Sequence, residues 1–365
     1  MPCKISVIIS MEENALERVL KAFNLEGTLE RFGDGHINIT YNLDNKYIIQ
    51  KLNTEVFPNP AGLMDNCWAV TNYIREKLEA EGKKTERQTL EFIATVDGKP
   101  FYEGEEGTFR VYRFIDQAYT LTNEKTPEIL YKAAKAIGRF QQILADFDAE
   151  KLFTVIPDFH NTPKRVENLK KSVEKNASGR AALVKDEIEF AYDIAKMAGA
   201  ITEAIADGSV PLRVSHNDTK LNNVLFDEKT NDSLCLIDLD TVMSGSYLYD
   251  FGDAMRFGAS TAAEDCTDLD KVSFDLDIFE AFTKGYLECA GNVLTEGEKK
   301  LIYTSVILMT YECGIRFLAD YIDGDVYFRT HYENHNLDRA RNQFKLVKDM
   351  LEKREQGEAI VKKYL

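Results

Sequence analysis

The stretch that decides the fold reads VSHNDTKLNNVLFDEKTNDSLCLIDLD and covers residues 214–240. Short apolar runs flank a segment rich in Asn and Asp, residue types that are also common in turns. Four polar positions nevertheless follow one another in a set order: His216, Asp218, Asn223 and, after the apolar run SLCLI, Asp238. A turn requires no such order, so the spacing favours a chemical site over an Asn-rich turn.

This spacing fits phosphoryl transfer. We predict that Asp218 accepts or orients the proton of an attacking hydroxyl and that Lys220 neutralises developing charge. Asn223 and Asp238 are the predicted Mg²⁺ ligands, because this ion prefers a few oxygen ligands and completes its shell with water and phosphate. The order matches the H-x-D-x-x-x-x-N motif and the later metal-binding Asp of protein kinases, although the last motif reads IDLD rather than DFG.

Composition limits the possible partners of the chain. It has 365 residues and a formal net charge of −16, which argues against nucleic acid or an anionic membrane as the main partner, since both require a positive surface. Six scattered cysteines indicate free thiols in a reducing compartment rather than a disulfide framework. No apolar run has the length of a signal peptide or a membrane span, so a cytoplasmic protein is expected. We expect a monomer, with an oligomer left open.

The hydrophobic pattern changes near residue 116. Before it, a helix over 11–24 precedes β-branched and aromatic runs separated by turns, and a second helix follows the N-cap Asn59 and Pro60 and ends near Gly82. After it come long helical patterns at 126–146, 163–175, 182–207, 275–291, 296–320 and 337–363, interrupted by strands and loops over 210–257. This predicts an α+β, bilobed, protein-kinase-like fold, with a lobe of small antiparallel sheet at 1–115 and a larger, mainly helical lobe at 116–365 that carries the predicted catalytic loop.

Features outside the loop are less specific. The glycine turn at 33–38 could cover a phosphate or could simply form a hairpin, and His36 on it could be a ligand or a strand residue. Gln50 takes the position of the lysine that pairs with phosphate on the third strand of kinases, and strand alternation sends Lys51 to the other face. The segment 249–253 (YDFGD) is predicted to brace the catalytic loop.

Several stretches together resemble the aminoglycoside phosphotransferase family, a branch of the protein-kinase-like fold. They are HNDTKLNNVLFD, CLIDLDTVM and YDFGDAMRFGAS, supported by GHIN at 35–38, YIIQKLN, VFPNPAGLMDNCWAVTNYI, RVYRFID and ECGIRFLADYIDGDVYF at 312–328. The longer matches resemble the sugar-phosphorylating members. The resemblance implies an ATP- and Mg²⁺-dependent kinase that phosphorylates the anomeric hydroxyl of N-acetylglucosamine or N-acetylgalactosamine.

The resemblance also implies that 1–115 is a nucleotide-binding lobe and 116–365 a catalytic and sugar-binding lobe, and it implies roles for particular residues. Asp218 would be the base, and Asn223 and Asp238 the metal ligands. The sugar would be surrounded by His36, Phe257, Arg316 and Tyr327. The nucleotide would meet Gly35, Gln50 and the backbone of Arg113, Phe114 and Ile115. Two alternatives stay open, namely a kinase of the same fold for an amino alcohol, homoserine, thio-sugar or aminoglycoside, and a non-catalytic binding module.

Overall fold

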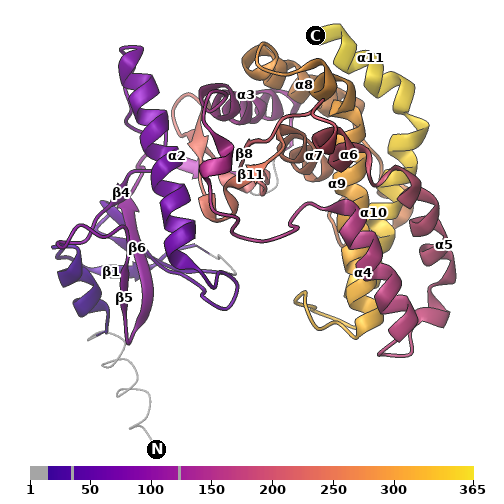
Figure 1. Cartoon of the computed structure of the whole chain (residues 1–365), viewed down its shortest axis with the longest axis horizontal. Coiled ribbons are helices and arrows are strands. Elements are labelled where there is room, and N and C mark those ends of the chain that lie inside the picture. The colour runs from indigo at the N-terminus through magenta and orange to yellow at the C-terminus, as the bar shows by residue number, and fades with distance from the viewer. Residues whose placement is uncertain (1–14, 34–36, 122–124) are drawn as a thin grey trace, which may run out of the picture.

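The N-terminal part of the chain forms an antiparallel sheet. The computed structural model describes residues 15–33, 37–121 and 125–365. The sheet has the order β1-β2-β3-β6-β4, with β5 paired to β6. Its strands are β1 (Leu29–Arg31), β2 (Ile39–Leu43), β3 (Tyr47–Lys51), β4 (Phe92–Ile93), β5 (Tyr102–Gly104) and β6 (Gly107–Arg113). Figure 1 shows this sheet beside α2 at one end of the molecule and the helical part at the other. The predicted α+β, protein-kinase-like fold is confirmed.

Local chemistry explains the turns and caps of this part. The β2–β3 turn places Asp44 and Asn45 at φ of 52° and 54°, a left-handed conformation that Asn and Asp tolerate well. The helix α2 (Pro60–Ala80) begins after Asn59, whose side chain accepts a hydrogen bond from the Gly62 N–H, with Pro at the first helical position. A further helix covers residues 15–22, the described part of the helix predicted over 11–24.

Two apolar cores hold the chain together. The smaller one lies between helix 15–22 and one face of the sheet and includes Val19, Ile49 and Val111. The larger one begins at the buried side of α2 and continues through the helical part, so α2 packs with the C-terminal core rather than with the small one. This shared core connects the sheet region to the segment that carries the predicted site.

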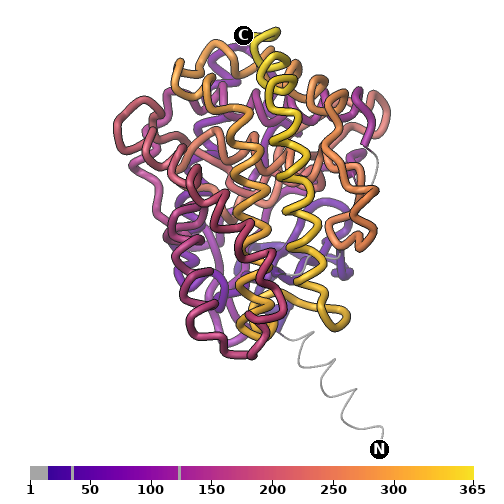
Figure 2. The backbone as a smooth tube through the Cα atoms, turned by 90° about the vertical axis from the view of Figure 1, so that its right-hand side faces the viewer, coloured from indigo at the N-terminus to yellow at the C-terminus, as the bar shows by residue number. Residues whose placement is uncertain are grey.

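The C-terminal part consists of long helices around two small sheets. The helices are α3 (Pro127–Ile143), α4 (Thr162–Lys175), α5 (Lys185–Ile194), α6 (Ala200–Ala206), α7 (Tyr247–Gly258), α8 (Leu276–Ala290), α9 (Glu296–Asp323), α10 (His335–Glu352) and α11 (Arg354–Tyr364). One sheet pairs β10 (Ser233–Leu236), β9 (Val224–Asp227) and β7 (Ala118–Thr120), and the other pairs β11 (Met243–Gly245) with β8 (Arg213–Ser215). Figure 2 shows the long helices side by side, with the N-terminal sheet behind them.

Three helix predictions were wrong in detail. The pattern over 182–207 is divided into the short helices α5 and α6, and that over 337–363 is divided at Lys353 into α10 and α11. Residues 247–258, expected within strands and loops, form α7, which is buried on nearly all sides. Among the described residues, α9 alone is long and apolar enough to span a membrane, but most of its apolar window is buried within the fold.

Candidate functional site

The catalytic loop is held by one buried carboxylate from α7. Asp250 accepts hydrogen bonds from the backbone N–H groups of His216 (3.1 Å) and Asn217 (2.8 Å) and from the Ser215 hydroxyl (2.9 Å). Gln141 of α3 donates a fourth bond at 2.9 Å. Burial raises the pKa of Asp250, and these donors oppose that rise. The predicted brace in segment 249–253 is therefore confirmed for Asp250.

His216 joins the loop to the segment that carries Asp238. Its Nδ1 lies 3.3 Å from the Asp218 N–H and accepts from it, so Nε2 is the nitrogen that donates to the Ile237 carbonyl at 2.9 Å. A second link runs from the Ile237 N–H to the Asn223 carbonyl, also at 2.9 Å. The loop with Asp218 and Asn223 and the segment with Asp238, together called the cassette, are thus adjacent in the fold although the β9–β10 hairpin separates them in sequence.

Asp218 lies among the groups that its predicted role requires. Lys220 Nζ is 2.9 Å from its Oδ1, and Asn223 Nδ2 donates to its carbonyl oxygen at 2.9 Å and to its Oδ2 at 3.3 Å. Burial alone would raise the pKa of Asp218, but Lys220 holds it below the ordinary value. The carboxylate is therefore ionised near neutral pH. Because Asn223 turns its amide nitrogen toward Asp218, its side-chain oxygen is left as a ligand atom.

Asp238 has the features of a carboxylate that needs a cation. It adopts φ of 60° after β10 and opens onto solvent. Loss of water around the carboxyl, together with the carboxylates of Asp240 and Asp218, raises its pKa to about 6. Among the described residues, no three His, Cys, Asp or Glu side chains form a complete metal cage. One carboxylate and one amide oxygen fit Mg²⁺, which keeps several water and phosphate ligands.

The helix α9 supports the loop on its other side. His160 Nε2 lies 3.0 Å from the Asn217 carbonyl oxygen, and its Nδ1 lies 3.0 Å from the buried carboxylate of Glu312. Thr162 donates to the second oxygen of Glu312 at 2.7 Å. Arg316 follows Glu312 by one helical turn and therefore lies on the same side of α9. Neither His160 nor Glu312 was predicted from sequence.

Three of the residues predicted to bind the sugar lie in the described part of the chain, and two of them contact one aromatic ring. The Lys125 ammonium lies 4.2 Å from the Phe257 ring centroid and donates to the Phe257 carbonyl at 2.7 Å. Arg316 packs 5.4 Å from the Phe328 ring, and Tyr327 meets that ring edge-on at 4.8 Å. Tyr327 is itself 73% exposed. These contacts bring Arg316 and Tyr327 to one aromatic cluster, while Phe257 stands at the end of α7.

The predicted nucleotide residues that the structure describes lie on β3 and at the end of β6, its neighbour in the sheet. Gln50 points to the same side of the sheet as Arg110, whereas Lys51 lies 5.8 Å from the Phe109 ring on the other face, as alternation predicts. The backbone N–H groups of Arg113 and Phe114 already donate to the Glu91 and Lys46 carbonyls.

Ile115 differs from its two neighbours. In the part of the chain that the structure describes, its N–H has no hydrogen-bond partner. Gly35 and His36 lie outside the described residues.

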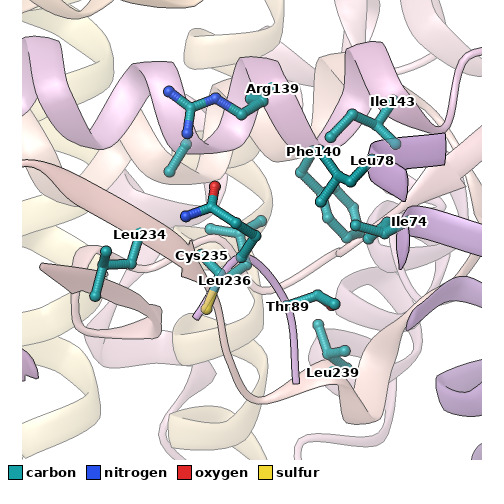
Figure 3. Close-up of a pocket in the computed structure, with 12 residues that line it drawn as sticks. Ile74, Leu78, Thr89, Arg139, Phe140, Ile143, Leu234, Cys235, Leu236 and Leu239 are labelled. Atoms are coloured by element: carbon teal, nitrogen blue, oxygen red, sulfur yellow. The ribbon is translucent and has the colours of Figure 1, made fainter. Parts of the chain in front are cut away.

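A small cavity lies behind the metal segment and is distinct from the site. It is bounded by α2, α3 and β10. Phe140 lines it together with Leu236 and Leu239, which lie on either side of Asp238 in sequence (Figure 3). Its volume of about 20 Å³ has room for about one water molecule, so it is too small for a substrate.

The fold and the site together define a protein-kinase-like phosphotransferase that acts on a small molecule. A family model described as "APH: Phosphotransferase enzyme family" matches residues 28–286, more than half of the chain. The chain belongs to this family.

Solved structures agree with this fold. An aminoglycoside phosphotransferase from Alicyclobacillus acidocaldarius has a TM-score of 0.66 and 13% identity, over 94% of this chain and 96% of that one. A choline/ethanolamine kinase family protein from Mesorhizobium loti has a TM-score of 0.56 and 16% identity, over 97% and 99%. A spectinomycin phosphotransferase in complex with ADP and spectinomycin has a TM-score of 0.58 and 14% identity, over 94% and 98%.

Proposed function

We propose that the chain is an N-acetylhexosamine 1-kinase, which transfers the γ-phosphoryl group of ATP to the anomeric hydroxyl of N-acetylglucosamine or N-acetylgalactosamine. One observation carries the chemistry: Asp218 is ionised, paired with Lys220 at 2.9 Å and bound to Asn223, within a loop hydrogen-bonded to the segment of Asp238. The proposed base and both proposed metal ligands lie in adjacent segments with a lysine beside them, which argues against a non-catalytic binding module.

The proposed roles follow from these positions. Asp218 orients the sugar hydroxyl, and Lys220 balances charge on the transferring group. Asn223 and Asp238 hold Mg²⁺, which supplies charge neutralisation on the nucleotide phosphates. An anomeric hydroxyl is more acidic than an ordinary alcohol, so positioning and electrostatics matter more here than a strong base.

Among the residues that the structure describes, only one of the three backbone N–H groups assigned to adenine is free to bind it. Of the three predicted amides, those of Arg113 and Phe114 are taken by carbonyls of the protein, which leaves the Ile115 N–H as the proposed donor. Phe32 and Phe114 meet edge to face at 5.8 Å and offer an aromatic wall beside it. Gln50 keeps its assignment to the nucleotide side, and Gly35 stays assigned from sequence.

Positive charge on the acceptor side supports a neutral sugar over a cationic acceptor. Burial lowers the pKa of Arg165, and the nearby positive charge of Arg316 lowers it further. In the described parts of the chain neither forms an ion pair, and Arg165 Nε has no hydrogen-bond partner. Guanidinium groups suit the carbonyl and hydroxyl oxygens of an acetylated sugar and repel an aminoglycoside or an amino alcohol. Phe257 and Tyr327 complete the proposed sugar site, and His36 stays assigned to it from sequence. We further propose that the protein is a cytoplasmic monomer.

The test is a panel of acceptors incubated with ATP and Mg²⁺, with the product examined by phosphorus NMR. The proposal expects turnover with N-acetylglucosamine or N-acetylgalactosamine and a phosphate signal coupled to H1 of the sugar. A product phosphorylated at another hydroxyl, or turnover only with choline, homoserine, a thio-sugar or an aminoglycoside, would refute the sugar assignment while keeping the chain a kinase. No nucleotide use with any acceptor would refute both.

A further inference from the structure

A buried arginine occupies the middle of the N-terminal sheet. Arg110 lies on β6 directly opposite Gln50 of β3 and is 2% exposed. Its Nε and Nη2 donate to Gln50 Oε1 at 2.9 and 2.8 Å, and Nη2 lies 2.5 Å from Asp240 Oδ1. A guanidinium at this depth is strongly unfavourable without such partners, so its pairing with Asp240 is a requirement of the fold.

The partner carboxylate belongs to the metal segment. Asp240 follows the proposed metal ligand Asp238 by two residues, and its second oxygen accepts from Asn38 Nδ2 at 2.6 Å. The side-chain oxygen Oδ1 of Asn38 in turn accepts from the Asn53 N–H at 3.0 Å. Asp240 thereby connects β6 and the entry to β2 with the segment that carries Asp238.

The helix α2 has no carboxylate for a cation in the sheet. Over its whole described length, its buried positions are apolar or neutral, and none is Asp or Glu. It is instead fixed to the same segment: Asn66 Nδ2 donates to the Val242 carbonyl at 2.8 Å, and Cys67 Sγ lies 3.5 Å from the Leu239 carbonyl. The lysine on the third strand and its helix carboxylate, familiar from protein kinases, therefore have no equivalent here.

We propose that Arg110 and Asp240 form a positioning pair that replaces this lysine–glutamate pair and sets the metal segment relative to the nucleotide-binding sheet. The Arg110 side chain lies on the same face of the sheet as position 50, but on the neighbouring strand β6. Gln50 stands where kinases have the lysine, and it accepts hydrogen bonds from Arg110. Because Arg110 does not reach solvent, it acts through Asp240 and Asn38 rather than by touching phosphate. The proposal rests on the phosphotransferase function but not on the identity of the acceptor.

The test compares Arg110→Met, Arg110→Lys, Asp240→Asn and the double variant Arg110→Met/Asp240→Leu. Loss of a group that orients a metal ligand typically costs about 10- to 100-fold in metal affinity or activity. We therefore expect Arg110→Met and Asp240→Asn to raise the Kd of Mg·ADP and the KM of Mg·ATP about tenfold or more, with the acceptor KM within about twofold. Arg110→Lys should recover part of the loss, since lysine keeps the charge but not the two-pronged contact.

Two controls separate positioning from folding. The double variant removes both buried charges and should restore the melting temperature without restoring Mg·ADP affinity. Lys51→Met removes a cation at the neighbouring position of β3, on the opposite face, and should change neither quantity. Nucleotide affinity close to wild type in the folded double variant, or equal losses for nucleotide and acceptor, would overturn the proposal. Since calorimetric binding of Mg·ADP needs no acceptor, a wrong sugar assignment leaves this experiment intact.

Discussion

Replacement of Asp238 by asparagine should stabilise the protein in the absence of Mg²⁺. The pKa of Asp238 rises from 3.8 to about 6, so the folded protein binds a proton there more tightly than the unfolded chain does. Stability therefore falls as pH rises from about 4 to about 6, and at pH 7.5 the ionised carboxylate is destabilising. Asparagine removes the charge, keeps the shape and tolerates the left-handed backbone at φ of 60°.

The size of this effect follows from the same shift. Two pKa units correspond to at most about 3 kcal/mol. Asp238 opens onto solvent, which screens its interaction with the neighbouring carboxylates, so we expect a gain of about 1 kcal/mol at pH 7.5. The gain should shrink toward zero below pH 4, where the native carboxyl is protonated in both folded and unfolded states.

Thermal melting at several pH values measures this prediction. The melting temperature of Asp238→Asn without metal should exceed that of wild type at pH 7.5, and Mg·ATP should stabilise wild type but not the variant. Asp240→Asn is the matched control two residues away: it removes the partner of the buried Arg110 and should cost about 3–5 kcal/mol. An Asp238→Asn protein that melts below wild type at pH 7.5, or whose difference from wild type is the same at pH 4, would refute the reasoning.

Three further predictions concern the loop and its support. Asp218→Asn should lower kcat by about 10²–10⁴ with little change in either KM, as steady-state kinetics would reveal, and near-normal turnover would rule out its role toward the hydroxyl. Arg316→Gln should raise the KM of the N-acetylated sugar about tenfold or more while leaving the KM of ATP unchanged, because it removes a donor of the proposed sugar site; an unchanged sugar KM contradicts this. Burial lowers the pKa of His160, but Glu312 outweighs burial and leaves it raised. Their ion pair therefore adds stability below pH 6.5 that is lost as pH rises through the folded pKa, so Glu312→Gln should lower the melting temperature more at pH 6 than at pH 9; equal losses would count against this pair.

The clustering of the candidate cassette was predictable because its residues are nearly contiguous in sequence. Asp218, Lys220 and Asn223 lie within six residues, and only the short hairpin of β9 and β10 separates them from Asp238. Local signals also predicted α2, since the N-cap Asn59, the following Pro60 and Gly82 mark its two ends in the sequence. The helix α7 was missed because it is buried on nearly all sides, so it lacks the polar face that marks an amphipathic helix.

The break between α10 and α11 had no local signal at Lys353, since the nearest glycine, Gly357, lies inside α11 and no proline occurs over 337–363. Ion pairs between residues far apart in the chain also had no signal in the local sequence. Asp240 lies within the quoted stretch, but its partner Arg110 comes from a strand 130 residues earlier. The run FRVYRFI holds two arginines, and an arginine in an otherwise apolar strand is a sign of a buried partner. Arg110 has such a partner in Asp240, whereas Arg113 pairs with the partly exposed Glu91.

The helix α9 explains why the acceptor is harder to predict from sequence than the reaction. Glu312 fixes the catalytic loop through His160 and the Asn217 carbonyl, whereas Arg316, one turn later, faces the aromatic cluster of Tyr327 and Phe328. One rigid element thus holds both the chemistry and the proposed sugar contacts. Because the two turns of α9 meet different partners, residues near 316 can change without moving Asp218. The acceptor side can therefore change while the cassette stays in place, and acceptor specificity has to be inferred from α9 and its neighbours.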